Sequence, residues 1–105
     1  MPGLAALLLM AGCSTPRRDG ALRFRCDVHS FAPPVYRFEP TSQTVILESQ
    51  GDEPIGRAMA ARRIGNTIQW RDGRFLAYRF DTRAMTLTQT FLPLGSNTVD
   101  SCRWS

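Results

Sequence analysis

The sequence has no lysine and only one histidine, His29, among its 105 residues. All 13 of its basic side chains are therefore arginines, and they are adjacent only at residues 17–18 and 62–63. Nucleic-acid-binding proteins usually gather their basic residues on one face or stripe, so the formal net charge of +4 predicts no nucleic-acid partner. A mildly basic surface of this kind would suit anionic glycans or lipid head groups.

Residue types that carry chemistry are equally scarce. One histidine cannot supply a zinc site, and the cysteines show no C-x-x-C spacing, so we expect no metal and no cofactor. A hydrolase needs a nucleophile, a base and an orienting partner, and no such set can be read from the chain. No glycine-rich phosphate loop or calcium loop is present. The sequence therefore predicts that the protein is not an enzyme.

No apolar run reaches the roughly 20 residues that cross a bilayer. The longest run, residues 4–11 (LAALLLMA), has the length of a signal-peptide core. It leads into residues 9–13 (LMAGC), which resemble the lipobox of bacterial lipoproteins. The resemblance implies cleavage before Cys13, a diacylglyceryl group on its thiol and attachment to the cell envelope through that lipid. Ser14 follows the cysteine, and a serine at this position is similar to the pattern of lipoproteins that are sorted to the outer membrane. This resemblance implies that the domain lies in the periplasm.

The three cysteines form an odd set. If Cys13 carries the lipid, Cys26 and Cys102 remain, and the oxidising envelope favours a disulfide between them. That bridge would join the first strand to the last, and in the chain-entropy model so long a loop is worth roughly 4–5 kcal/mol. We expect a signal peptide at residues 1–12, a lipidated tether at 13–20 and a single β domain at 21–105.

The fold class follows from the period of the apolar residues. After Gly20 several segments alternate apolar and polar side chains with a period of two, as half-buried strands do. Residues 55–63 are predicted as a strand rather than a short helix, and Ile64, Ile68 and Trp70 are expected to share a face. Asp72-Gly73 predicts a two-residue hairpin turn.

Short connections of this kind favour antiparallel neighbours. The prediction is an all-β fold of seven or eight short strands, arranged as a small antiparallel up-and-down barrel or as a sandwich. Most aromatic residues share faces with aliphatic ones and are assigned to the core. Phe31 and Phe75 fall outside that pattern, and together with Arg79 they are the candidate contact residues.

Residues 22–104 resemble the membrane-bound inhibitors of C-type lysozyme in architecture: these are small lipidated β-barrels with cysteines near both ends of the domain. The inhibitory segment of that family has a Ser-x-x-Gly-x-x-Tyr-type pattern, whereas residues 60–65 (AARRIG) occupy the comparable region here. We expect a non-enzymatic envelope module that binds an envelope protein or glycan or supports envelope structure. The alternatives are a lysozyme-type inhibitor on a diverged barrel and an enzyme with no sequence-visible site. The oligomeric state is left open.

Overall fold

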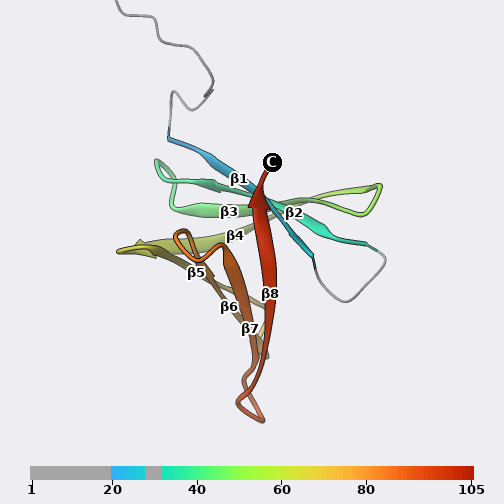
Figure 1. Cartoon of the computed structure of the whole chain (residues 1–105), viewed down its shortest axis with the longest axis vertical. Coiled ribbons are helices and arrows are strands. Elements are labelled where there is room, and N and C mark those ends of the chain that lie inside the picture. The colour runs from blue at the N-terminus through green and yellow to red at the C-terminus, as the bar shows by residue number, and fades with distance from the viewer. Residues whose placement is uncertain (1–19, 28–31) are drawn as a thin grey trace, which may run out of the picture.

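The computed structural model describes residues 20–27 and 32–105, which form one closed antiparallel barrel (Figure 1). Each strand pairs with the next in the chain, and the last pairs with the first. The strands are β1 (Leu22–Asp27), β2 (Pro34–Glu39), β3 (Thr44–Gln50), β4 (Glu53–Ile64), β5 (Thr67–Asp72), β6 (Leu76–Asp81), β7 (Thr86–Phe91) and β8 (Ser96–Trp104). The predicted all-β, up-and-down barrel is confirmed, and the sandwich alternative is wrong.

Several expectations concern the parts of the chain outside the described residues. The signal peptide, the lipobox with Cys13 and the tether lie before residue 20, and His29 and Phe31 lie within residues 28–31. Those expectations remain predictions.

The period-two pattern is realised most clearly in β1. Phe24 and Cys26 are fully buried, while Arg23 and Arg25 between them are exposed. Side chains of successive strand residues point to opposite faces, so the pattern alone fixes which face of β1 lines the interior.

The disulfide closes the barrel where its two chain ends meet. Cys26 on β1 stands directly opposite Cys102 on β8, and the two are bonded, with Cα atoms 4.0 Å apart. The predicted pairing of these cysteines, and the joining of first and last strands, are therefore confirmed. The bridge fastens the one strand pair that no short turn connects.

Aromatic rings fill much of the interior. The Phe24 ring stacks on the Phe80 ring, and Trp70 stacks on Tyr78 with ring centroids 5.3 Å apart. The predicted assignment of most aromatics to the core is confirmed. The buried core consists of Phe24, Cys26, Tyr36, Phe38, Val45, Leu47, Ala61, Ile68, Trp70, Phe80 and Leu87.

Two local expectations are wrong. Ile64 is the last residue of β4, where it stands opposite Thr67 on the outer face, and it is 51% exposed. Ile68 belongs to the next strand and is buried, so the two residues do not share a face. The β5–β6 turn has three residues rather than two, because Asp72 pairs with Leu76. Gly73 begins that turn with a φ of 73°, a left-handed conformation that glycine adopts without steric cost.

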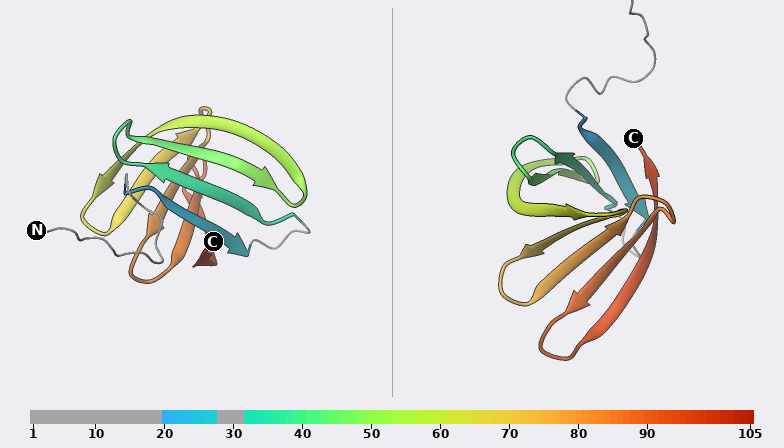
Figure 2. Two further views of the ribbon diagram at one scale, coloured as in Figure 1. Left: turned by 90° about the horizontal axis from the view of Figure 1, so that it is seen from above. Right: turned by 90° about the vertical axis from the view of Figure 1, so that its left-hand side faces the viewer.

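The strand β4 is long and changes partner along its length. Its first part, residues 53–60, pairs with β3, whereas only Ala61 to Ile64 pair with β5. Figure 2 shows β4 arching across the top of the barrel between its two neighbours. On the β5 side the two strands therefore separate beyond the Ala61–Trp70 pair, and a seam opens in the barrel wall.

Candidate functional site

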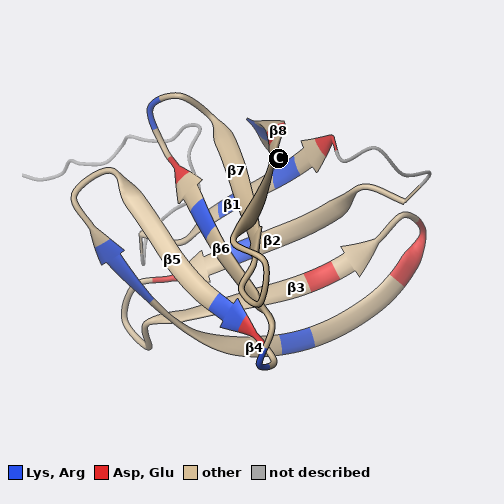
Figure 3. Cartoon of the chain, turned by 90° about the horizontal axis from the view of Figure 1, so that it is seen from below, with Lys and Arg blue, Asp and Glu red and all other residues tan. Residues whose placement is uncertain are grey.

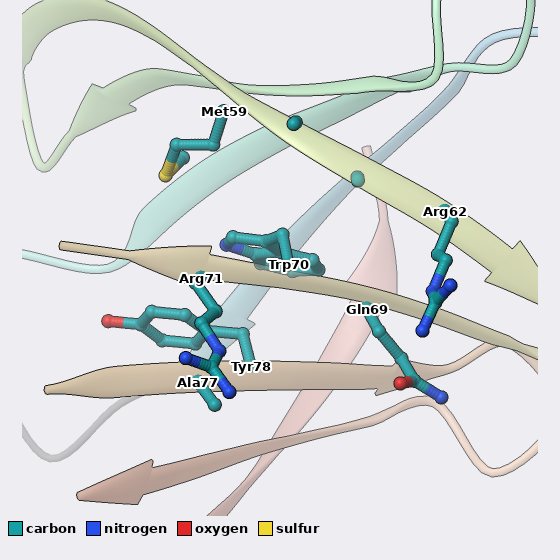
Figure 4. A pocket seen from close by; sticks show the side chains of 9 residues that line it. Met59, Arg62, Gln69, Trp70, Arg71, Ala77 and Tyr78 are labelled. Carbon is teal, nitrogen blue, oxygen red and sulfur yellow. The ribbon is translucent and has the colours of Figure 1, made fainter. Parts of the chain in front are cut away.

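A groove of about 550 Å³ lies at this seam. Three consecutive strands supply its walls, and Figure 4 shows their side chains. We call it the β4–β6 groove; it is lined by Met59, Ala60, Ala61, Arg62, Gln69, Trp70, Arg71, Ala77 and Tyr78. Because the strands diverge there, side chains from both the inner and the outer face of the sheet reach the same opening.

Three arginines lie on the outer face at and beside the groove: Arg62 and Arg71 line it, and Arg79 lines an adjoining hollow. Gln69 on β5 is flanked directly by Arg62 on β4 and by Arg79 on β6. Arg71 lies two residues along β5 from Gln69, so it points to the same face. All three arginines are exposed, and none forms an ion pair within the described residues. We call Arg62, Arg71 and Arg79 the arginine triad.

Two arginines elsewhere on the outer face are paired with a carboxylate. On the β1–β3 side, Arg23 and Arg37 share Glu48 at 2.6 and 3.0 Å. Basic bands on β4, β5 and β6 are visible in Figure 3. The triad therefore offers three unpaired positive charges within the width of three strands, roughly 10 Å between the outer two at a strand spacing of about 4.8 Å.

The inner side of the groove presents polar atoms among aromatic rings. Trp70 is 4% exposed, and its indole Nε1 is buried without a hydrogen-bond partner among the described residues. The Tyr36 ring packs 5.2 Å from Trp70, centroid to centroid. Buried polar groups are normally hydrogen-bonded, so the indole N–H is a donor with unused capacity.

Burial sets the protonation of the two tyrosines. Desolvation raises the pKa of Tyr36 well above its ordinary value of 10.0, and the nearby Tyr78 and Asp72 raise it further. The pKa of Tyr78 is also raised, by desolvation first and then by Asp72. Both phenols therefore remain neutral hydroxyls at physiological pH.

An ion pair spans the seam. Arg57 on β4 donates from Nη2 to Oδ2 of Asp72 at the end of β5, at 2.7 Å. These residues lie where β4 and β5 no longer pair through their backbones. The side chains thus link two strands that the sheet itself leaves apart.

The contact residues expected from the sequence are placed in different regions. Arg79 belongs to the triad on β6. Phe75 lies in the β5–β6 turn, where it is 53% exposed and its ring is 6.2 Å from that of Phe91. Phe31 lies outside the described residues. The exposure of Phe75 agrees with its selection, but a contact role for Phe75 or Arg79 stays a prediction.

Sequence reasoning did not find Arg62, Gln69 and Arg71 as members of one site. Arg62 and Arg79 are 17 positions apart along the chain, and only the strand register makes them neighbours of the same residue. A signal was present in the alternation of β5, which assigns Gln69 and Arg71 to the face opposite Trp70.

Residues 60–65, which the resemblance to lysozyme inhibitors singled out in the sequence, form the end of β4 and the turn that follows it. Among the described residues, no group of three or more histidine, cysteine, aspartate or glutamate side chains is arranged to hold a metal ion. In the same part of the chain there is no helix of the length and apolarity that a membrane span requires.

Comparison with known proteins gives no family assignment: no family model, no curated protein and no solved structure matches this chain.

Proposed function

We propose that this chain is a small lipoprotein of the bacterial cell envelope whose barrel is a non-enzymatic binding module. The observation that carries the binding role is the β4–β6 groove with its unpaired arginine triad. Its lining of arginine, glutamine, alanine and aromatic side chains suits a ligand held by charge, hydrogen bonds and apolar contact.

Two features support the proposed location in the cell envelope. Residues 9–13 resemble a lipobox, so Cys13 would carry the lipid, and Ser14 favours the outer membrane with the barrel in the periplasm. The Cys26–Cys102 disulfide suits an oxidising compartment, where such bonds form and persist.

This function is tested by asking whether the chain still binds cell envelopes when it carries no lipid. The expected mature chain, residues 13–105, with the substitution Cys13→Ser would be mixed with isolated cell envelopes and sedimented. We expect the lipid-free chain to co-sediment with the envelopes, because the groove rather than the lipid makes the contact. A lipid-free chain that stays in the supernatant contradicts the binding role.

A matched pair of bulky substitutions then locates the contact. Ala77→Trp, made in the lipid-free chain, would fill the groove, and we expect it to abolish co-sedimentation. Ser42→Trp places the same side chain on the exposed β2–β3 turn and should leave retention unchanged. Equal retention of both variants would show that the envelope is contacted elsewhere.

A further inference from the structure

We propose that the β4–β6 groove and the hollow beside it bind a phosphorylated saccharide, with the phosphate on the arginine triad and the sugar hydroxyls on the uncharged polar side chains of the hollow. This inference rests on the proposed binding function and names the chemistry of its ligand.

The arrangement of the arginine triad suits the binding of an oxyanion such as phosphate. Arg62 and Arg79 stand opposite one glutamine from its two sides, and Arg71 lies two residues along the middle strand, so three positive charges that repel one another are gathered there. No carboxylate of the described residues pairs with them. An arginine fork matches the oxygens of phosphate in a bidentate geometry, so a bound phosphate would relieve the repulsion of all three charges.

A second hollow of about 270 Å³, which we call the polar hollow, adjoins the groove, and Arg79 of the triad lines it. It shares Gln69, Ala77 and Tyr78 with the β4–β6 groove, so the two form one continuous surface. Its far side is made of Thr88, Thr90 and Asn97. The surface thus passes from three positive charges to hydroxyl and amide groups over the width of a few strands.

The uncharged side chains of the polar hollow retain hydrogen-bonding capacity for sugar hydroxyls. The Thr90 hydroxyl donates to Asn97 Oδ1 at 2.6 Å, which leaves the Asn97 amide nitrogen as a donor. Gln69 donates from Nε2 to Thr67 at 3.1 Å, which leaves its carbonyl oxygen as an acceptor. Hydroxyl groups donate and accept at once, so they complement such a mixed surface.

The binding test uses the purified full chain with its disulfide intact and three probes: glucose monophosphate, glucose and inorganic phosphate. Calorimetric titration should give glucose monophosphate the highest affinity, because only this probe engages both parts of the surface. Glucose monophosphate that binds no more tightly than inorganic phosphate overturns the saccharide assignment, and the absence of binding by either phosphate probe overturns the proposal as a whole.

Two double variants, each of which removes two positive charges, distinguish a specific site from a general effect of basic charge. Arg62→Gln with Arg79→Gln should weaken glucose monophosphate about tenfold or more, the loss expected for charge-assisted hydrogen bonds. Arg25→Gln with Arg103→Gln removes another directly opposed arginine pair, where Arg25 shares a separate pocket with Asp52 and Glu53. That control should bind as the native chain does, and equal losses in both double variants would refute the site.

Sedimentation with vesicles distinguishes a saccharide that is part of a lipid head group from a soluble sugar. Phosphatidylcholine vesicles with and without lipid A, a lipid with a phosphorylated disaccharide head, would be sedimented with the Cys13→Ser chain. Retention only on lipid A vesicles assigns the ligand to a lipid head group, while binding of glucose monophosphate without vesicle retention assigns it to a soluble sugar. Envelope co-sedimentation that survives loss of the triad would refute this inference and leave the proposed function standing.

Discussion

The Phe24 ring on β1 stacks on the Phe80 ring on β6, with centroids 3.8 Å apart and planes 3° from parallel. These strands are not neighbours in the sheet, so the contact crosses the interior of the barrel. Both side chains are fully buried. The interior around them is a packed core, and the β4–β6 groove opens in the wall of the barrel between its strands.

Removal of this stack should be costly. Phe80→Ala deletes a fully buried ring and leaves a cavity, which typically costs about 3–5 kcal/mol of unfolding free energy. Urea unfolding measures the loss. Phe75→Ala, at a ring that is 53% exposed, is the matched control and should cost less than 1 kcal/mol or so. Similar losses for the two variants would mean that the interior is not packed as described.

The disulfide should stabilise the closure of the barrel. Replacing Cys26 and Cys102 together by serine removes the covalent link between β1 and β8, and we expect a loss of about 2–5 kcal/mol. Cys13→Ser replaces the cysteine outside this pair and should leave the thermal midpoint unchanged. A double variant as stable as the native chain would show that the strand pairing alone closes the barrel.

Burial of Tyr36 predicts instability at alkaline pH. Its folded-state pKa lies above the ordinary value of 10.0, so below that pH both states are protonated and the stability is complete. Above it the unfolded state loses the phenolic proton first, and the free energy of unfolding falls as pH rises toward the folded pKa. Denaturation followed from about pH 9 to about pH 11 measures this decline.

The variant Tyr36→Phe has no proton to lose at this position. Its free energy of unfolding should therefore decline less steeply over the same pH range than that of the native chain. Tyr78→Phe should act in the same direction, since the pKa of Tyr78 is also raised. Equal slopes for Tyr36→Phe and the native chain would show that Tyr36 titrates normally.

The proposed function also predicts the result of a lysozyme assay. Residues 60–65 form the end of β4 and a tight turn and lack the serine and tyrosine of the inhibitory pattern. We expect C-type lysozyme to retain full activity in a molar excess of this chain. Inhibition would instead support the diverged-inhibitor alternative, and the effect of Ala77→Trp on it would show whether the groove takes part.

Period-two alternation predicted most of the strands, because the alternation of buried and exposed side chains can be read along the chain, whereas the cysteine pair was predicted from the cysteine count. The reasoning from alternation failed at Ile64, where an apolar residue belongs to the strand before the turn and faces outward. The turn prediction from Asp72-Gly73 failed for another reason, since the register of β5 against β6 leaves Phe75 in the turn.

The arginine triad illustrates what sequence alone could not provide. Arg62, Arg71 and Arg79 read as dispersed charges along the chain, and their proximity depends on which residue of β4 and β6 stands opposite Gln69. The seam beside them arises because β4 exchanges one partner for another at Ala61. Register and partner exchange are properties of the assembled sheet.

The most direct test of the central claim, that this is a disulfide-closed envelope lipoprotein, is the intact mass of the protein isolated from bacterial membranes, with and without a reductant. We predict a chain that begins at Cys13, carries added acyl mass and gains the mass of two hydrogens when the single disulfide opens. An unprocessed chain with three free thiols would contradict the lipid anchor, the compartment and the covalent closure of the barrel together.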